Sequence, residues 1–513
     1  TDGNAERKTP LFFSSCIVGN NTFSDDSITF SNFHGLEGAE GAIALADGNP
    51  PTPAQLADIQ NFPATFDMSD HDCDTAYGSN LELIEAVEIP PFVPSGDIDP
   101  APSAEEVAAL CEVEQTQGEV NFGAAPVSCP RLDQYNLFAD EEDPTSTPNS
   151  SGIPFVLNTK LFSDYSLKYR VAYLPPGTNA TYSAPGANKP TATLEYPEGT
   201  IIAKTFSFLD GDNETPAETR LIIKRRNSSG QVIWAGLAYV WRTAENGERF
   251  ATLEPAGTVL SVSWNYTDVE TNQLQQGSTD NYRVPDRNQC IQCHANNDLE
   301  GGTAPIGLKV RNLNRPYRSE SSTVTDQSQH EIGGQNQIAY MCSQGVVTGC
   351  PADLGVNQNS QIAENLERLP KFNIPGDGSF DAGTPEDIEE RTRAWLEVNC
   401  QHCHNPSGFA ANTGYYLDVF RAVDTSYGIC KGPTATGAEG SDGRSVDIQP
   451  GNAAASILEF RISEEADSPA ARMPPVARSV VDVEGHALVR NWINNVVTTD
   501  EQRYPGSTSC NDN

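Results

Sequence analysis

Two copies of the pattern Cys-x-x-Cys-His constrain this chain more than any other feature of its sequence. They are Cys290-Ile291-Gln292-Cys293-His294 and Cys400-Gln401-His402-Cys403-His404. Because the 513 residues include 12 cysteines and 7 histidines, random placement would produce roughly 0.004 such patterns. A zinc site needs four ligands, and a thioredoxin-like site needs a βαβ context and no fixed histidine. Neither explains two copies of the whole pattern.

The pattern is typical of covalent haem attachment, in which two cysteine sulfurs add to the haem vinyl groups and the histidine binds the iron. We therefore expect two haem c groups, with His294 and His404 as iron ligands, and we expect electron transfer as the function. Bacterial attachment of haem to this pattern takes place outside the cytoplasmic membrane. The sequence therefore predicts an exported protein, either periplasmic or extracellular at the cell surface.

The charge balance restricts the partners of the chain. Its 70 acidic residues outnumber the 32 basic ones, which gives a formal net charge of −38. Nucleic acid and anionic lipid surfaces are excluded as partners, because like charges repel. We expect redox partner proteins or an extracellular electron acceptor instead. No apolar run is long enough to span a bilayer, and Thr1-Asp2-Gly3-Asn4 has no signal pattern, so we expect a processed sequence without a transmembrane segment.

The chain is too long for one hydrophobic core, and its residue pattern changes twice. Residues 1–150 read as an irregular, cysteine-rich segment with one short helix that begins at Ser103. Residues 151–284 contain short β-branched and aromatic runs, which predict an antiparallel sandwich or barrel-like β domain. The pattern then becomes helical, and predicts a first haem module over residues 285–375 and a second over residues 376–513.

Eight cysteines lie outside the two patterns, an even number that suits disulfides in an oxidising compartment. Cys342 and Cys350 are close enough in sequence to pair. The first 150 residues contain four cysteines that we expect to pair among themselves: Cys16, Cys73, Cys111 and Cys129. Cys430 and Cys510 are then left to form a disulfide with each other. The sequence does not settle how the four N-terminal cysteines pair.

The second module resembles class I cytochrome c. Residues 388–398 predict an amphipathic helix that leads into Cys400, and residues 488–496 predict a final helix. Between them Met473, one of three methionines in the chain, precedes two prolines. The resemblance implies that Met473 is the sixth ligand of the second haem iron, rather than a core residue. Methionine ligation raises the reduction potential.

The sixth ligand of the first haem iron stays open at this point. No Met-Pro pair follows His294. Met341, on a predicted helix, and His330 are the local candidates, although Met341 is equally well interpreted as a core residue. His34 or His71, from the N-terminal segment, is a third candidate, and a vacant sixth position is the remaining alternative.

Residues 304–308 follow His294 at the distance where class I cytochromes carry a loop that packs on the proximal histidine. His402 lies between the cysteines of the second pattern, where His404 already takes the ligand position. We therefore expect His402 to be a solvent-facing spacer, and His486 to lie on the surface of the final helix.

Several segments resemble a family of proteobacterial di-haem cytochromes of uncharacterised role, which have a β-rich region before the haem sites. They include Lys160–Tyr165, Lys204–Phe206, Glu218–Arg220, Arg311–Asn314 and Arg393–Cys400. The resemblance extends from residue 155 to residue 492 and leaves the first 150 residues unexplained. It implies electron transfer without a defined substrate.

Two other functions are weighed against this one. A di-haem peroxidase-like enzyme also has two such patterns, but it needs one iron with an accessible face. The long β-rich region and the methionine of the second module argue against it. A subunit of an extracellular cytochrome filament is the second alternative, a homo-oligomer in which the N-terminal segment docks on its neighbour.

A weaker candidate site is the turn Asp210-Gly211-Asp212-Asn213-Glu214. Its carboxylates and amide are oxygen ligands of the kind that Ca2+ prefers. The turn lacks the full EF-hand pattern, so an ordinary acidic turn is the favoured interpretation.

Overall fold

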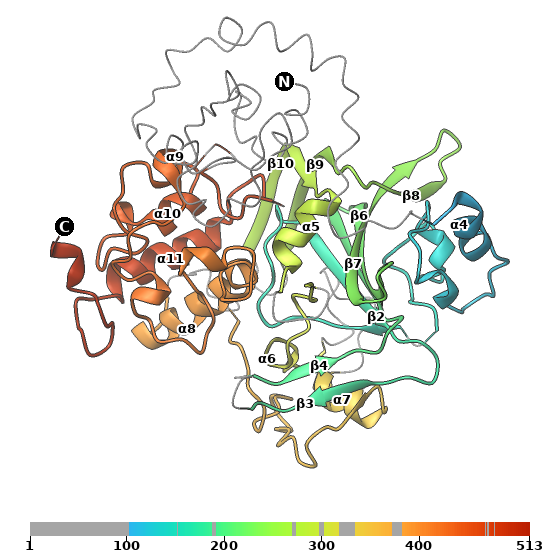
Figure 1. Cartoon of the computed structure of the whole chain (residues 1–513), viewed down its shortest axis with the longest axis horizontal. Coiled ribbons are helices and arrows are strands. Elements are labelled where there is room, and N and C mark those ends of the chain that lie inside the picture. Colours follow the sequence, from blue (N-terminus) through green and yellow to red (C-terminus); the bar gives the residue numbers. More distant parts are fainter. Residues whose placement is uncertain are drawn as a thin grey trace, which may run out of the picture. The chain divides into compact units, whose positions relative to one another are not determined.

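The computed structural model describes residues 102–150, 152–186, 191–268, 273–296, 302–317, 334–371, 382–466, 468, 471–476 and 478–512. The chain divides into two units, Thr1–Ile98 and Asp99–Asn513, and every described residue belongs to the second. Figure 1 shows a β-sheet in this unit with short helices around it. The candidate ligands His34 and His330, and the cysteines Cys16 and Cys73, lie outside the described residues.

The large β-sheet confirms the prediction of an antiparallel β region. Its strand order is β1-β2-β5-β6-β7-β8, and β9 pairs with both β5 and β10. The strands are β1 (Ile153–Pro154), β2 (Leu167–Tyr173), β5 (Ile201–Asp210), β6 (Asn213–Arg226), β7 (Val232–Thr243), β8 (Arg249–Leu253), β9 (Thr258–Asp268) and β10 (Gln273–Val284). The pairings are antiparallel, except that β5 meets β9 in parallel at one residue pair.

One face of this sheet packs against residues 111–138. Alternate side chains of β2, β5, β6 and β7 share an apolar cluster with Tyr135 and Leu137. The disulfide Cys111–Cys129 closes this segment, and α4 (Ala104–Cys111) precedes it with Ser103 as the predicted cap. The described part of the N-terminal segment is mostly turns and short helical segments, and it forms one core with the sheet.

The opposite face of the sheet carries three short helices and a small second sheet. The helices are α5 (Arg287–His294), α6 (Val310–Leu313) and α7 (Gln337–Ser343), and the small sheet consists of β3 (Ala180–Ser183), β4 (Thr193–Glu195) and β11 (Val347–Thr348). Val310, Ile338 and Met341 pack in one cluster with Ala172 and Ile202 of the large sheet. The predicted disulfide Cys342–Cys350 closes the turn after α7.

The C-terminal part is helical, as the sequence predicts. It contains α8 (Pro385–Leu396), which continues into a π-helical turn (Glu397–Gln401), then α9 (Gly437–Ser441), α10 (Ile457–Ile462) and α11 (Val483–Asn495). Helices α8 and α11 pack together around Trp395 and Trp492. The predicted disulfide Cys430–Cys510 is present. In the described ranges, no helix combines the length and the apolar character that crossing a membrane requires.

Candidate functional site

The first Cys-x-x-Cys-His pattern lies on α5, directly after β10. Asp286 caps this helix by accepting a hydrogen bond from a backbone N–H of its first turn. The spacing i, i+3, i+4 places Cys290, Cys293 and His294 on one face of the helix. Helix α5 approaches β7 at Gly236, where a Cβ atom would lie 3.2 Å from the Cβ of Cys290. The missing side chain therefore permits this close packing.

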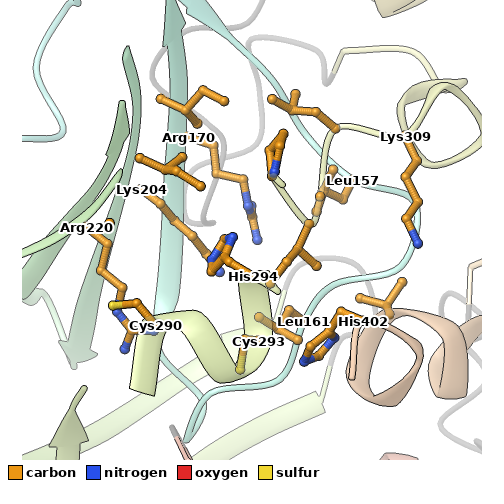
Figure 2. A pocket seen from close by; sticks show the side chains of 18 of the residues that line it. Leu157, Leu161, Arg170, Lys204, Arg220, Cys290, Cys293, His294, Lys309 and His402 are labelled. Carbon is orange, nitrogen blue, oxygen red and sulfur yellow. The ribbon is translucent and has the colours of Figure 1, made fainter. Parts of the chain in front are cut away.

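The ring of His294 is oriented by a hydrogen bond from its Nδ1–H to the carbonyl oxygen of Ala304, at 2.7 Å. A carbonyl only accepts, so Nε2 keeps a free lone pair. Burial lowers the pKa of His294, so the imidazole is neutral at neutral pH. Figure 2 shows this ring inside a cavity that Cys290 and Cys293 also line. The loop that begins at Ala304 thus packs on the histidine as predicted.

The second pattern repeats this arrangement at the end of α8. Its cysteines and His404 line a second cavity. The Nδ1–H of His404 donates to the carbonyl oxygen of Tyr415 at 3.2 Å, and the two rings meet edge to face with centroids 5.1 Å apart. Burial lowers the pKa of His404 to about 4. Both histidines are therefore neutral and keep Nε2 available to bind a metal ion.

Burial also affects the first cysteine of each pattern. It raises the pKa of the Cys290 thiol to about 11 and that of the Cys400 thiol to about 12. Catalytic or redox-sensing cysteines instead have lowered pKa values and exposed thiolates. The Cys290 and Cys400 thiols are therefore protonated at neutral pH, which does not fit either of them as a catalytic thiol.

Met473 lines the same cavity as His404. Its backbone N–H donates to the carbonyl oxygen of Arg461 at 2.8 Å, and its own carbonyl accepts from Arg478 Nη1 at 2.5 Å. The structure therefore brings together the two residues that the sequence predicts as ligands of the second iron.

Met341, a candidate ligand of the first iron, lies elsewhere. Its side chain is 5% exposed and packs in α7 beside Ile338 and Val347. It is not among the described residues that line the cavity of His294. The position of Met341 therefore favours its interpretation as a core residue over that as an iron ligand. The candidates His330, His34 and His71 are outside the described residues.

The two patterns meet at Cys293, His402 and Cys403. The Sγ atoms of the two cysteines and a ring nitrogen of His402 all lie within 4.8 Å of one another, and Cys403 Sγ donates to the carbonyl oxygen of Gln292 at 3.0 Å. The prediction that His402 faces solvent is wrong. Its Nδ1 is buried without a hydrogen-bond partner in the described structure, and its ring lines both cavities.

His486 also differs from its prediction as a plain surface residue. It lies on α11, and its Nε2 is 3.0 Å from Oε1 of Glu459. Its side chain is only 20% exposed. Packing of α11 on α10 covers this position, which the sequence pattern of one helix does not reveal.

Three basic residues in the wall of the first cavity were missed by the sequence reasoning. They are Arg170, Lys204 and Arg220, from β2, β5 and β6. Burial and the charges of Arg170 and its neighbours lower the pKa of Lys204 well below its ordinary value. The sequence alone could have indicated them, because each is a basic residue at a strand position where the alternation of side chains predicts an interior one.

The proposed calcium turn forms the hairpin between β5, which ends at Asp210, and β6, which begins at Asn213. Asp210 accepts a hydrogen bond from Ser263 at 2.8 Å, and Glu214 accepts one from Tyr169 at 3.0 Å. Among the described residues, the carboxylates of this turn do not gather three ligand atoms in one place.

No protein-family model, curated protein or solved structure matches this chain. The functional assignment therefore depends on the sequence patterns and on the geometry. Two cavities, each with two thiols and a neutral imidazole, can hold a covalently attached group that contains a metal ion.

Proposed function

We propose that this chain is a c-type cytochrome with two covalently attached haem groups. One observation carries the proposal: each pattern faces its own cavity, with the histidine Nδ1 tied to a backbone carbonyl and Nε2 free. His294 with Ala304 and His404 with Tyr415 both have this arrangement. Histidines that bind metal ions are commonly oriented by such a hydrogen bond from the other ring nitrogen.

The residues of both cavities fit haem c. Both cavities are lined mostly by apolar side chains, as ligand pockets usually are. Each has the two thiols that haem attachment needs. Haem bound there would supply an iron that gains and loses one electron. In the second cavity, Met473 is the proposed sixth ligand, and the packing of α8 on α11 supports a class I-like module.

The more particular proposal is an exported electron-transfer protein of the β-rich di-haem family that the sequence resembles. The approach of Cys293 and Cys403 supports electron transfer, because the two attachment sites adjoin. The three disulfides support a compartment outside the cytoplasm, either periplasmic or at the cell surface. The partner is a redox protein or an extracellular electron acceptor.

The first test is a count of covalent haem groups. We expect the protein, produced in a host that attaches haem to exported chains, to carry two. The double variants Cys290→Ser/Cys293→Ser and Cys400→Ser/Cys403→Ser should carry one each, because each removes one attachment site. Intact mass and the pyridine haemochrome spectrum measure the count.

The matched control for this count is Cys342→Ser/Cys350→Ser, which removes two cysteines that form a disulfide. This variant should keep both haem groups. A wild-type protein without covalent haem from such a host contradicts the proposed function.

The second test separates an electron carrier from a peroxidase-like enzyme. We expect reversible one-electron reduction at both sites and peroxide turnover far below the roughly 10 s⁻¹ median of enzymes. The reason is that Met473 lines the cavity of His404, where as the proposed sixth ligand it would close the second iron to peroxide. Potentiometry and steady-state peroxide reduction are the measurements. Stoichiometric CO binding at one reduced site, together with turnover near that median, would favour the peroxidase-like function.

A second candidate function is a metal centre at Cys293, His402 and Cys403. The clustering of their ligand atoms within 4.8 Å favours it, since two thiolates and an imidazole suit zinc. A zinc centre at these three residues leaves His294 and His404 without a role, and we therefore prefer haem attachment. Zinc bound stoichiometrically by a haem-free protein and lost on His402→Ala, as measured by elemental analysis, would support this candidate instead.

A further inference from the structure

Three basic side chains form a row across the sheet in the wall of the first cavity. Arg170 on β2 is directly opposite Lys204 on β5, and Lys204 is directly opposite Arg220 on β6. All three line the cavity that contains His294. Figure 2 shows their side chains reaching from the strands toward the cavity.

Such a row opposes the stability of the sheet. Like charges directly opposite each other on neighbouring strands are destabilising, and burying a charge without a partner costs free energy. The chain has a net charge of −38 with only 32 basic residues. A row of three basic residues, of which Arg170 is buried and the other two are partly exposed, is therefore not what this composition favours.

The protein itself neutralises one end of the row. Arg220 donates to Glu218 through Nε at 2.8 Å and Nη2 at 2.5 Å, and Glu218 also accepts from the hydroxyl of Tyr282 at 2.6 Å. This carboxylate is therefore already engaged at the Arg220 end of the row.

The middle of the row has no hydrogen-bonded anion. Among the described residues, the side chain of Lys204 makes no hydrogen bond or close ion pair, although it feels the charge of Glu218. Its Nζ lies 4.6 Å from the centre of the Phe206 ring, and the guanidinium of Arg220 lies 4.3 Å from the same centre. The Phe206 ring stabilises cations through its face, but it cannot accept a full charge-assisted hydrogen bond. Lys204 thus has a donor directed at the cavity and no protein acceptor for it.

We propose that the row formed by Arg170, Lys204 and Arg220 binds a small carboxylate or oxyanion inside the first cavity. Lysine ammonium and arginine guanidinium groups are the side chains that bind such anions most strongly. The anion has one of two sources. The first source is a propionate of a haem attached at Cys290 and Cys293, and it rests on the proposed function. The second source is a small oxyanion from solution, and it is independent of the proposed function.

The test uses the full chain with its attached haem groups and the variant Lys204→Met. The matched control is Lys224→Met, which removes the same charge from the same sheet. Lys224 donates to the carbonyl of Tyr196 and is not among the cavity-lining residues. Calorimetric titration with sodium nitrite tests the free oxyanion. The resonance Raman bands of the haem propionates test the other source.

Either of two results supports the inference. In the first, nitrite binds both the wild type and Lys224→Met, but binds Lys204→Met at least about tenfold more weakly. A tenfold loss of affinity is the smallest that we expect when a hydrogen bond to a charged group is removed. In the second, nitrite does not bind, and the propionate bands shift in Lys204→Met but not in Lys224→Met. The inference is overturned when Lys204→Met and Lys224→Met have the same nitrite affinity, or both fail to bind nitrite, and also have the same propionate bands.

If Lys204→Met does not fold, Lys204→Gln is measured under the same criteria, because it removes the charge but keeps a polar side chain. If the protein carries no haem, the proposed function fails separately. The nitrite titration alone then decides the anion site, with equal affinities in the two variants, or no binding at all, as the overturning result.

Discussion

Glu397→Gln is expected to lower the free energy of unfolding by about 3 to 5 kcal/mol, the loss found when one partner of a buried ion pair is removed. The Glu397 side chain is buried and accepts from Arg311 through Nε at 2.8 Å and also through Nη2. Lys309 Nζ lies 3.3 Å from the same carboxylate oxygen. The other oxygen accepts from the backbone N–H of Val419 at 3.1 Å. The substitution therefore leaves two cations without their shared carboxylate.

This ion cluster joins the two segments that carry the Cys-x-x-Cys-His patterns. Lys309 and Arg311 follow the first pattern, and Glu397 lies three residues before Cys400. Denaturant unfolding at pH 7 measures the effect. The control is Glu386→Gln, since Glu386 is 67% exposed and lies 3.5 Å from Arg503; exposed pairs contribute at most about 1 kcal/mol. Equal unfolding free energies for the two variants would contradict the prediction.

The same contribution depends on pH. Burial alone would raise the pKa of Glu397, but the charges of Lys309 and Arg311 outweigh burial and hold that pKa below its ordinary value of 4.5. Because the unfolded chain has the higher pKa, the stabilisation is fully present above about pH 4.5 and is lost as the pH falls through the folded value. The difference in unfolding free energy between the wild type and Glu397→Gln should therefore shrink below that pH.

The strands that could be predicted from the sequence are those with β-branched and aromatic residues. The β-branched and aromatic runs at residues 167–173 and 232–241, which predict strands, form β2 and lie within β7. The sequence does not predict strand β10, because Gln273–Val284 is mostly polar and exposes half of its side chains to solvent. It forms through its long pairing with the preceding strand β9, and the composition of one segment alone does not reveal this pairing.

The site was predictable where residues adjacent in sequence act together, and not where distant segments meet. The attachment cysteines and their histidines follow from local spacing. The place of His402 beside Cys293 depends on how the C-terminal helices pack, which no local pattern encodes. The row of Arg170, Lys204 and Arg220 likewise depends on strand register, since these residues are far apart in the chain.

Arg478→Met is expected to abolish the proposed binding of Met473 to the second haem iron, although the hydrogen bonds of the Arg478 guanidinium are to backbone carbonyls. Arg478 is 5% exposed, and its guanidinium donates to five carbonyl oxygens. These belong to Val480 at 3.1 Å, Arg461 at 3.1 Å, Met473 at 2.5 Å, Ile462 at 2.9 Å and Ser463 at 3.0 Å. Arg478 is therefore a positioning residue, which fixes the Met473 loop against the end of α10.

The loss should be large because methionine cannot donate to any of these carbonyls. We expect the free energy of unfolding to fall by at least about 3 kcal/mol, the value of one or two hydrogen bonds from a charged group. The burial that lowers the pKa of Arg478 to about 10 still leaves it charged at neutral pH, so all five bonds are charge-assisted in the wild type. Arg478→Lys should recover only part of the loss, since a single ammonium cannot reach the same set of acceptors.

Two readouts separate positioning from general stability. The red-edge charge-transfer band of a sulfur-ligated ferric haem reports whether Met473 is bound, and denaturant unfolding reports stability. Met473→Ala should lose the band with only a small decrease in the free energy of unfolding, whereas Arg478→Met should lose the band and be strongly destabilised. The charge control Arg490→Met should keep both the band and the stability of the wild type. Arg490 suits this role because its side chain is 58% exposed and its nearest carboxylate, that of Glu459, is 4.0 Å away. A full-intensity band in folded Arg478→Met would show that the Met473 loop holds its position without Arg478, and a band that survives Met473→Ala would show that Met473 is not the ligand.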